Sequence, residues 1–174
     1  MKRKTLRVVL WLAVVLWMAV IFAFSAESGG ASTETSDGVV DCVDEGMFGT
    51  SDRDVLGDSV RLKVSFYVRK AAHFLAFMTL GILSSAACRT DIMKTLPACA
   101  VSFGICVLYA VSDELHQTFV PGREGRLLDV GIDSAGALCG VLVFTALCAI
   151  ATRVRRRRTK GTPCGVSTDD RGKV

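Results

Sequence analysis

Residues 112–130 read SDELHQTFVPGREGRLLDV, and this polar stretch lies between two long apolar segments. It carries two adjacent acids, a His, a Gln, a Pro-Gly pair, two Arg and a further Asp. The apolar segment before it begins at Thr95, and the one after it ends at Ala151. A helix needs about 20 mainly apolar residues to cross a bilayer core. The pattern therefore predicts two membrane-spanning helices joined by a polar connection.

Two further apolar segments, Leu6–Phe24 and Ala71–Cys88, lie earlier in the chain. Of the 174 residues, 51% are hydrophobic, and the mean hydropathy of +0.42 is high for a soluble domain. The expected fold class is all-α, an integral membrane four-helix bundle. The expected divisions are a first transmembrane helix over 1–24, an extracytoplasmic loop over 25–68, a core with three transmembrane helices over 69–151, and a basic cytoplasmic tail over 152–174.

The first helix has a rival interpretation as a cleaved signal peptide. It has a basic start, an apolar centre and small residues near Ala23–Ala26. Its apolar run is longer than the usual signal-peptide core of about 7–15 residues. We therefore favour a retained helix, with cleavage as the alternative.

The distribution of basic residues predicts which ends of the helices face the cytoplasm. Lys and Arg are in excess in cytoplasmic loops near helix ends. They occur before the first helix, in the short loop at Arg89 and Lys94, and after the fourth helix, whereas the segment between Glu27 and Asp58 is acidic. We expect a multi-pass protein of the cell membrane with both termini cytoplasmic, and with residues 25–68 and 113–129 outside.

The Arg155–Arg158 run has two interpretations, as a nucleic-acid patch or as a membrane anchor. It directly follows an apolar segment, which is typical of a stop-transfer signal that also contacts anionic lipid headgroups. We therefore expect membrane lipids as partners and no nucleic acid.

Small residues on the fourth predicted helix include the pair Gly136 and Gly140. Glycines four residues apart let membrane helices approach closely. Packing within the same chain is the favoured interpretation, and a dimer contact is the alternative.

The predicted topology brings three separate polar stretches to one membrane boundary, because the second and fourth helices begin there and the third ends there. Asp133 lies about one turn inside that boundary, so we expect it to face the bundle interior and to meet a basic or hydroxyl group. The candidate polar site consists of Arg69, Lys70, His73, Asp113, Glu114, Gln117, Arg123, Asp129 and Asp133.

Two interpretations of this cluster are compatible with the sequence. Its opposite charges suit a structural network of ion pairs and hydrogen bonds that ties helix ends together. Alternatively, the cluster holds a polar ligand, with its Arg and Lys side chains binding phosphate or carboxylate. Asp113, Glu114 and His73 are residue types that move protons, but no catalytic residue can be assigned and catalysis remains open.

The sequence predicts neither a metal nor a cofactor. His73, Asp113, Glu114 and His116 are metal-ligating types, but they show no known spacing such as H-E-x-x-H. The seven Cys include no C-x-x-C pair and predict neither a disulfide framework nor a zinc site. Nucleotide-binding and serine-hydrolase motifs are also missing from the sequence.

Two segments carry a resemblance to a known family: RKAAHF at 69–74 and SDELHQTFVPGR at 112–123, followed by Asp129 and Gly136. In these residues the chain resembles the VanZ-like family of small bacterial membrane proteins over roughly residues 60–150, and the first helix fits by position. The chain departs from the family pattern at three positions: Phe77 where Tyr is frequent, Arg126 where Ser is frequent, and Asp133 where Asn is frequent.

The resemblance implies a place in the bacterial cell envelope and, from the founding member, a link to resistance to glycopeptide antibiotics, above all teicoplanin. We expect a protein that binds or modifies a lipid-linked or surface ligand, with a lipid-linked envelope precursor or another envelope protein as partner. The alternative is a non-catalytic membrane partner that stabilises another envelope protein. A small transporter is a third and weaker hypothesis. Of the candidate polar residues, only Asp133 is expected to lie inside the membrane, and a path across the membrane would need more.

Overall fold

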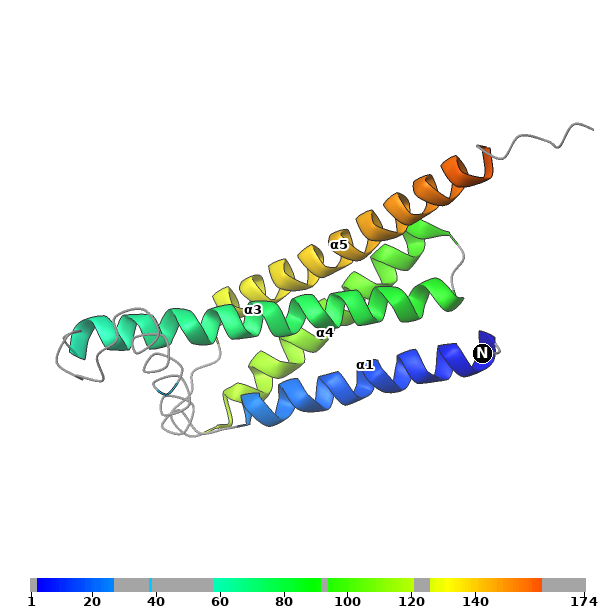
Figure 1. Cartoon of the computed structure of the whole chain (residues 1–174). Helices are drawn as coiled ribbons and strands as arrows, with labels where there is room; N and C mark the ends of the chain where they lie inside the picture. Colours follow the sequence, from blue (N-terminus) through cyan, green and yellow to red (C-terminus); the bar gives the residue numbers. More distant parts are fainter. Residues whose placement is uncertain (1–2, 27–37, 39–57, 92–93, 121–125, 161–174) are drawn as a thin grey trace, which may run out of the picture.

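The computed structural model describes residues 3–26, 38, 58–91, 94–120 and 126–160. Four helices, labelled as in Figure 1, make up nearly all of these residues, and the described part of the chain contains no strand. They are α1 (Arg3–Ser25), α3 (Asp58–Asp91), α4 (Thr95–Gln117) and α5 (Leu127–Lys160). All four are long and apolar enough to cross a membrane. The predicted all-helical membrane fold is confirmed.

The helices alternate in direction, so that α1 and α4 end where α3 and α5 begin (Figure 1). We call this end of the bundle the polar end; Ser25, Gln117 and Leu127 mark it. Helix α3 contacts each of the other three helices, most extensively α5. In Figure 1 it lies between α1 and α5. Helix α1 packs mainly on α3 and only lightly on α4.

Two helices are longer than the apolar segments that predicted them. Helix α3 begins at Asp58, well before the apolar segment Ala71–Cys88 that predicted it. Helix α5 continues through the arginine run to Lys160. At 34 residues each, these helices extend about 50 Å, well beyond a hydrocarbon core of about 30 Å. Their polar ends therefore project past the apolar layer.

The core of the bundle is small and is built from all four helices. Phe77 and Leu80 of α3 are fully buried, and α1 contributes Val14 and Ile21. Large side chains on the outside, such as Leu108 at 73% exposed, are apolar. This distribution is the one that lipid requires, because hydrocarbon does not penalise exposed apolar surface. Whether α1 is retained or cleaved stays a prediction.

Glycines determine how closely α3 and α5 approach. A Cβ atom added at Gly136 would collide with the Phe74 carbonyl oxygen, and one added at Gly140 would collide with that of Met78. The contact is reciprocal, since a Cβ at Gly81 of α3 would meet the Ala137 carbonyl oxygen of α5. The Gly136 and Gly140 pair therefore packs within the chain, as the favoured interpretation predicted.

Side-chain hydrogen bonds fasten α1 and α4 to the rest of the bundle. The Trp17 indole donates to the Ala76 carbonyl oxygen at 2.9 Å, and the Tyr109 hydroxyl donates to the Met18 carbonyl oxygen at 2.6 Å. Ser85 and Ser102 hydrogen-bond each other between α3 and α4 at 3.1 Å. Such bonds between membrane helices contribute about 0.6 kcal/mol on average. They specify which faces meet more than they stabilise the fold.

Candidate functional site

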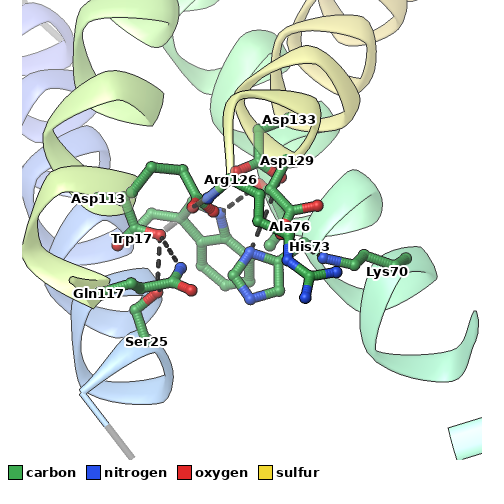
Figure 2. A network of polar contacts seen from close by, with 11 residues as sticks. Trp17, Ser25, Lys70, His73, Ala76, Asp113, Gln117, Arg126, Asp129 and Asp133 are labelled. Carbon is green, nitrogen blue, oxygen red and sulfur yellow. Dashed lines mark hydrogen bonds and ion pairs between the residues drawn. The ribbon is translucent and has the colours of Figure 1, made fainter. Parts of the chain in front are cut away.

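A pocket opens at the polar end between α3, α4 and α5, with a volume of about 560 Å³. Its walls come from three helices that are distant in sequence and from the residue just before α5 (Figure 2). The lining residues are Phe66, Arg69, Lys70, His73, Glu114, Gln117, Arg126, Asp129, Ile132 and Asp133.

Charge in the pocket is separated by depth. The cationic side chains are the more exposed ones: Arg126 is exposed, and Arg69 and Lys70 are half-buried. The acids are deeper, since Glu114 is 5% exposed and Asp133 only 1%. The pocket therefore presents positive charge at its mouth and carboxylates at its floor.

The mouth is partly organised by ion pairing. The Lys70 ammonium pairs with Asp129, one turn of α5 above Asp133, and lies 5.2 Å from the centroid of the Phe66 ring. The backbone N–H of Arg126 donates to Glu114 at 3.0 Å, which joins the start of α5 to the end of α4. Asp129 also lies in the first turn of α5, where the helix dipole favours a negative charge.

Asp133 lines the floor of the pocket, and the buried Asp113 lies beside it behind the lining. The Ser25 hydroxyl donates to Asp113 Oδ2 at 2.6 Å, and the Gln117 amide donates to the same oxygen at 3.1 Å and to the Ser25 oxygen at 2.9 Å. Across the floor, His73 Nδ1 lies 3.7 Å from Asp133 Oδ1. Figure 2 shows these side chains pointing toward one another from all four helices.

Two carboxylate oxygens at the floor are buried without a hydrogen-bond partner: Oδ1 of Asp113 and Oδ2 of Asp133. His73, Asp113 and Asp133 each offer one ligand atom, and these three atoms lie within 4.8 Å of one another. No metal-ligand spacing appears in the sequence because the three residues come from three helices. His116, the other histidine considered, instead packs its ring on Phe22 with a centroid distance of 4.4 Å.

The structure brings together all but one of the residues expected to form the polar site. Arg123 lies outside the described residues. Asp133 faces the interior as expected, and its partner is a histidine from the same set. The network and pocket interpretations share most of their side chains, because the paired residues Lys70, Asp129, His73 and Asp133 also line the cavity. Asp113 belongs to the network but not to the lining.

Sequence reasoning missed Ser25, Arg126, Phe66 and Ile132. Ser25 is fully buried at the end of α1. The sequence signal that could have identified it is a hydroxyl residue at the end of an apolar run. Arg126 lies in the polar connection before α5, but single residues there carry no periodic pattern. Phe66 and Ile132 are apolar side chains at a polar pocket and have no distinguishing signal.

The fold and the site together define a four-helix membrane protein with a charged pocket at one end of the bundle. The family model described as VanZ/LLP1 matches residues 10–149, so the chain belongs to the VanZ/LLP1 family. The match begins inside α1, earlier than the resemblance over residues 60–150 had indicated. Searches of curated proteins and of solved structures found no match.

Proposed function

We propose that this protein binds the anionic group of a lipid-linked or surface-exposed molecule of the bacterial cell envelope. One observation carries the proposal: the pocket at the polar end has Arg69, Lys70 and Arg126 around its mouth. Arginine binds phosphate and carboxylate through two parallel N–H···O bonds, and lysine adds a point charge. Phosphate and carboxylate are also the groups that headgroups present at a membrane surface.

The position of the pocket supports a ligand that is itself anchored in the membrane. Large apolar side chains are exposed at the polar end, among them Phe119 at 79%, Leu127 at 91% and Leu128 at 79%. Side chains of this kind are favourable in the interfacial layer of a bilayer and costly in water. A headgroup bound in the pocket would therefore keep its acyl or polyprenyl chain in lipid.

The size of the pocket supports a headgroup-sized ligand. Its volume of about 560 Å³ falls within the range of about 300–1,000 Å³ common for small-molecule sites. A link to teicoplanin susceptibility would then act through the envelope molecule that the protein binds, and not through capture of the much larger antibiotic.

We further propose that the polar end faces away from the cytoplasm and that both termini are cytoplasmic. Basic residues gather at the opposite end, where Arg7 lies near the start of α1, Arg89 lies near the end of α3 and Lys94 precedes α4. The basic continuation of α5 projects from that same end. This arrangement follows the excess of Lys and Arg in cytoplasmic loops.

Mass spectrometry of lipids that co-purify with the protein tests the proposal. Wild-type protein in mild detergent should retain an anionic lipid or a lipid-linked precursor. Arg69→Ala and Arg126→Ala should lose most of it. Arg89→Ala is the matched control, because Arg89 lies at the opposite end and donates to Thr95. Equal retention of the lipid by all four proteins would overturn the proposal.

A second measurement separates a binding site from a structural network. Pocket variants should change an envelope or teicoplanin-susceptibility phenotype while the amount of membrane-inserted protein stays constant. If every variant acts only by lowering the protein level, the network interpretation stands alone. If a second envelope protein co-purifies and is lost from cells without this chain, while the pocket variants remain active, the stabilising-partner alternative stands instead.

A further inference from the structure

The floor of the pocket has a composition that the proposed function does not use. We propose that His73, Asp113 and Asp133 form a binding site for a divalent transition-metal ion, zinc or manganese. The site draws one ligand atom from each of α3, α4 and α5. It does not depend on which molecule binds at the mouth of the pocket.

The geometry is close to that of a formed site. The three ligand atoms lie within 4.8 Å of one another, and His73 Nδ1 is 3.7 Å from Asp133 Oδ1. With metal–ligand bonds of about 2.0–2.2 Å, two ligand atoms of a tetrahedral site lie about 3.3–3.6 Å apart. The His73–Asp133 distance is already near this value, and the set closes on an ion when its atoms move inward.

Burial provides an independent reason for a cation at this position. Asp133 is 1% exposed and Asp113 2%, and each has one oxygen without a hydrogen-bond partner. A buried carboxylate needs a cation or hydrogen-bond donors to offset its lost hydration. Lys70, the lysine of the pocket, pairs with Asp129. A divalent ion would supply partners to both unsatisfied oxygens and balance two negative charges.

Neighbouring residues orient Asp113 in the way that outer-shell residues orient metal ligands. Ser25 and Gln117 both donate to Oδ2, at 2.6 and 3.1 Å, which fixes the carboxylate and leaves Oδ1 buried without a hydrogen-bond partner. Hydrogen bonds to ligating carboxylates fix their orientation and typically contribute 10- to 100-fold in metal affinity. Ser25 thereby links α1 to a site whose ligands all lie on other helices.

The ligand types select the metal. Imidazole suits zinc and other transition metals, and carboxylate oxygens suit manganese and magnesium, so one nitrogen with two oxygens favours zinc or manganese. The three residues include no thiolate, which disfavours softer ions. Three protein ligands also leave at least one coordination position for another group. If the proposed function holds, an oxygen of the bound headgroup would take that position.

Calorimetric titration of the purified protein with Zn²⁺ and with Mn²⁺, in detergent and without a histidine tag, tests the inference. Wild-type protein should bind about one ion per chain, as a preformed set of ligands requires. His73→Gln, Asp113→Asn and Asp133→Asn should each weaken binding by about 100-fold or more, because each removes a direct ligand. Ser25→Ala should weaken it by about 10- to 100-fold.

Asp91→Asn is the matched control, since Asp91 pairs with Arg7 at the opposite end at 3.2 Å and should bind metal as the wild type does. The result that overturns the inference is wild-type protein without saturable binding of either ion, or binding that persists in all three ligand variants because thiols hold the ion. Wild-type protein without saturable binding overturns the inference even if a variant fails to fold.

The metal inference and the proposed function can fail separately. Arg69→Ala should lose the co-purifying lipid and still bind the ion. Lipid binding without metal binding overturns the metal site and leaves the proposed function standing. Metal binding without a bound lipid overturns the proposed function and leaves the metal site standing.

Discussion

Asp113 has one oxygen with two donors and one with none, and this difference originates on α1. Ser25 and Gln117 both donate to Oδ2, whereas Oδ1 is buried without a hydrogen-bond partner. The hydroxyl of Ser25 thus helps to fix the orientation of a carboxylate on another helix.

Removing that hydroxyl should loosen the polar end. We expect Ser25→Ala to lower the free energy of unfolding by about 1 kcal/mol, because the hydroxyl makes two hydrogen bonds and each contributes about 0.6 kcal/mol on average within a membrane bundle. Reversible unfolding in mixed detergent, followed by helical circular dichroism, measures the change. Thr118→Ala is the control, because its exposed hydroxyl bonds only to the local Leu115 carbonyl. An equal effect of both substitutions would show that Ser25 has no special role.

The Lys70–Asp129 pair provides a test that separates stability from binding. We expect Lys70→Met and Asp129→Met each to destabilise the fold, because each leaves one charge of the pair without its partner. The double variant should recover most of the loss, with a coupling of about 0.5–3 kcal/mol. The same unfolding assay gives both values.

Lipid retention by that double variant should not recover, since the cation at the mouth is gone. A double variant that regains both stability and lipid would mean that Lys70 serves only the network.

At the scale of the elements, the contact between α3 and α5 depends on the absence of side chains. Gly81, Gly136 and Gly140 each lie against a carbonyl oxygen of the other helix, and a Cβ there would collide with backbone. Backbone cannot move aside as the end of a flexible side chain can. This contact fixes the positions of Asp129 and Asp133 relative to Lys70 and His73.

Adding one carbon to this contact should therefore be costly. Gly136→Ala and Gly140→Ala should each destabilise the protein by about 1–3 kcal/mol, the usual cost of overpacking. Gly131→Ala is the control on the same helix, because nothing lies within 4 Å of its added Cβ. It should be neutral or stabilising by up to about 1 kcal/mol. Thermal unfolding in detergent compares the three, and similar melting temperatures would contradict the close approach.

The elements were predictable because their signal is long and redundant. Each helix carries an apolar run long enough to cross a membrane. Replacing any single residue of such a run by a polar one would leave the helix recognisable in the sequence. The ends were less predictable: α3 and α5 extend into polar sequence at Asp58 and Lys160 because their polar turns continue a helix already nucleated. The convergence of Arg69, His73 and Asp133 followed from topology alone, since alternating helices return to the same boundary.

The detailed chemistry of the site was not predictable in the same way. The partner of Asp113 is Ser25, some ninety positions away, and no local spacing connects them. The set of His73, Asp113 and Asp133 likewise depends on how three helices rotate about their axes. Sequence patterns give the face of a helix, whereas individual contacts need the packed structure.

At the scale of the whole molecule, the distribution of charge makes one prediction about orientation. Cys42 follows α1 in the sequence and Cys164 follows α5, so α3, α4 and α5 lie between the two cysteines. We expect a membrane-impermeant thiol reagent added to intact cells, after removal of the cell wall, to label Cys42 but not Cys164. Permeabilised cells should show both, which is the control for reactivity. Labelling of Cys42 only after permeabilisation would reverse the topology.

The light contact of α1 with α4 has a consequence for biogenesis. Helix α1 is synthesised first, but Asp113, which accepts a hydrogen bond from the Ser25 hydroxyl, is translated nearly ninety residues later. The polar end is therefore completed only after α4 has been made. Cysteines placed at 25 and 117 should cross-link in the finished chain but not in ribosome-bound chains that stop before α5. An early cross-link would show that α1 and α4 find each other without α5.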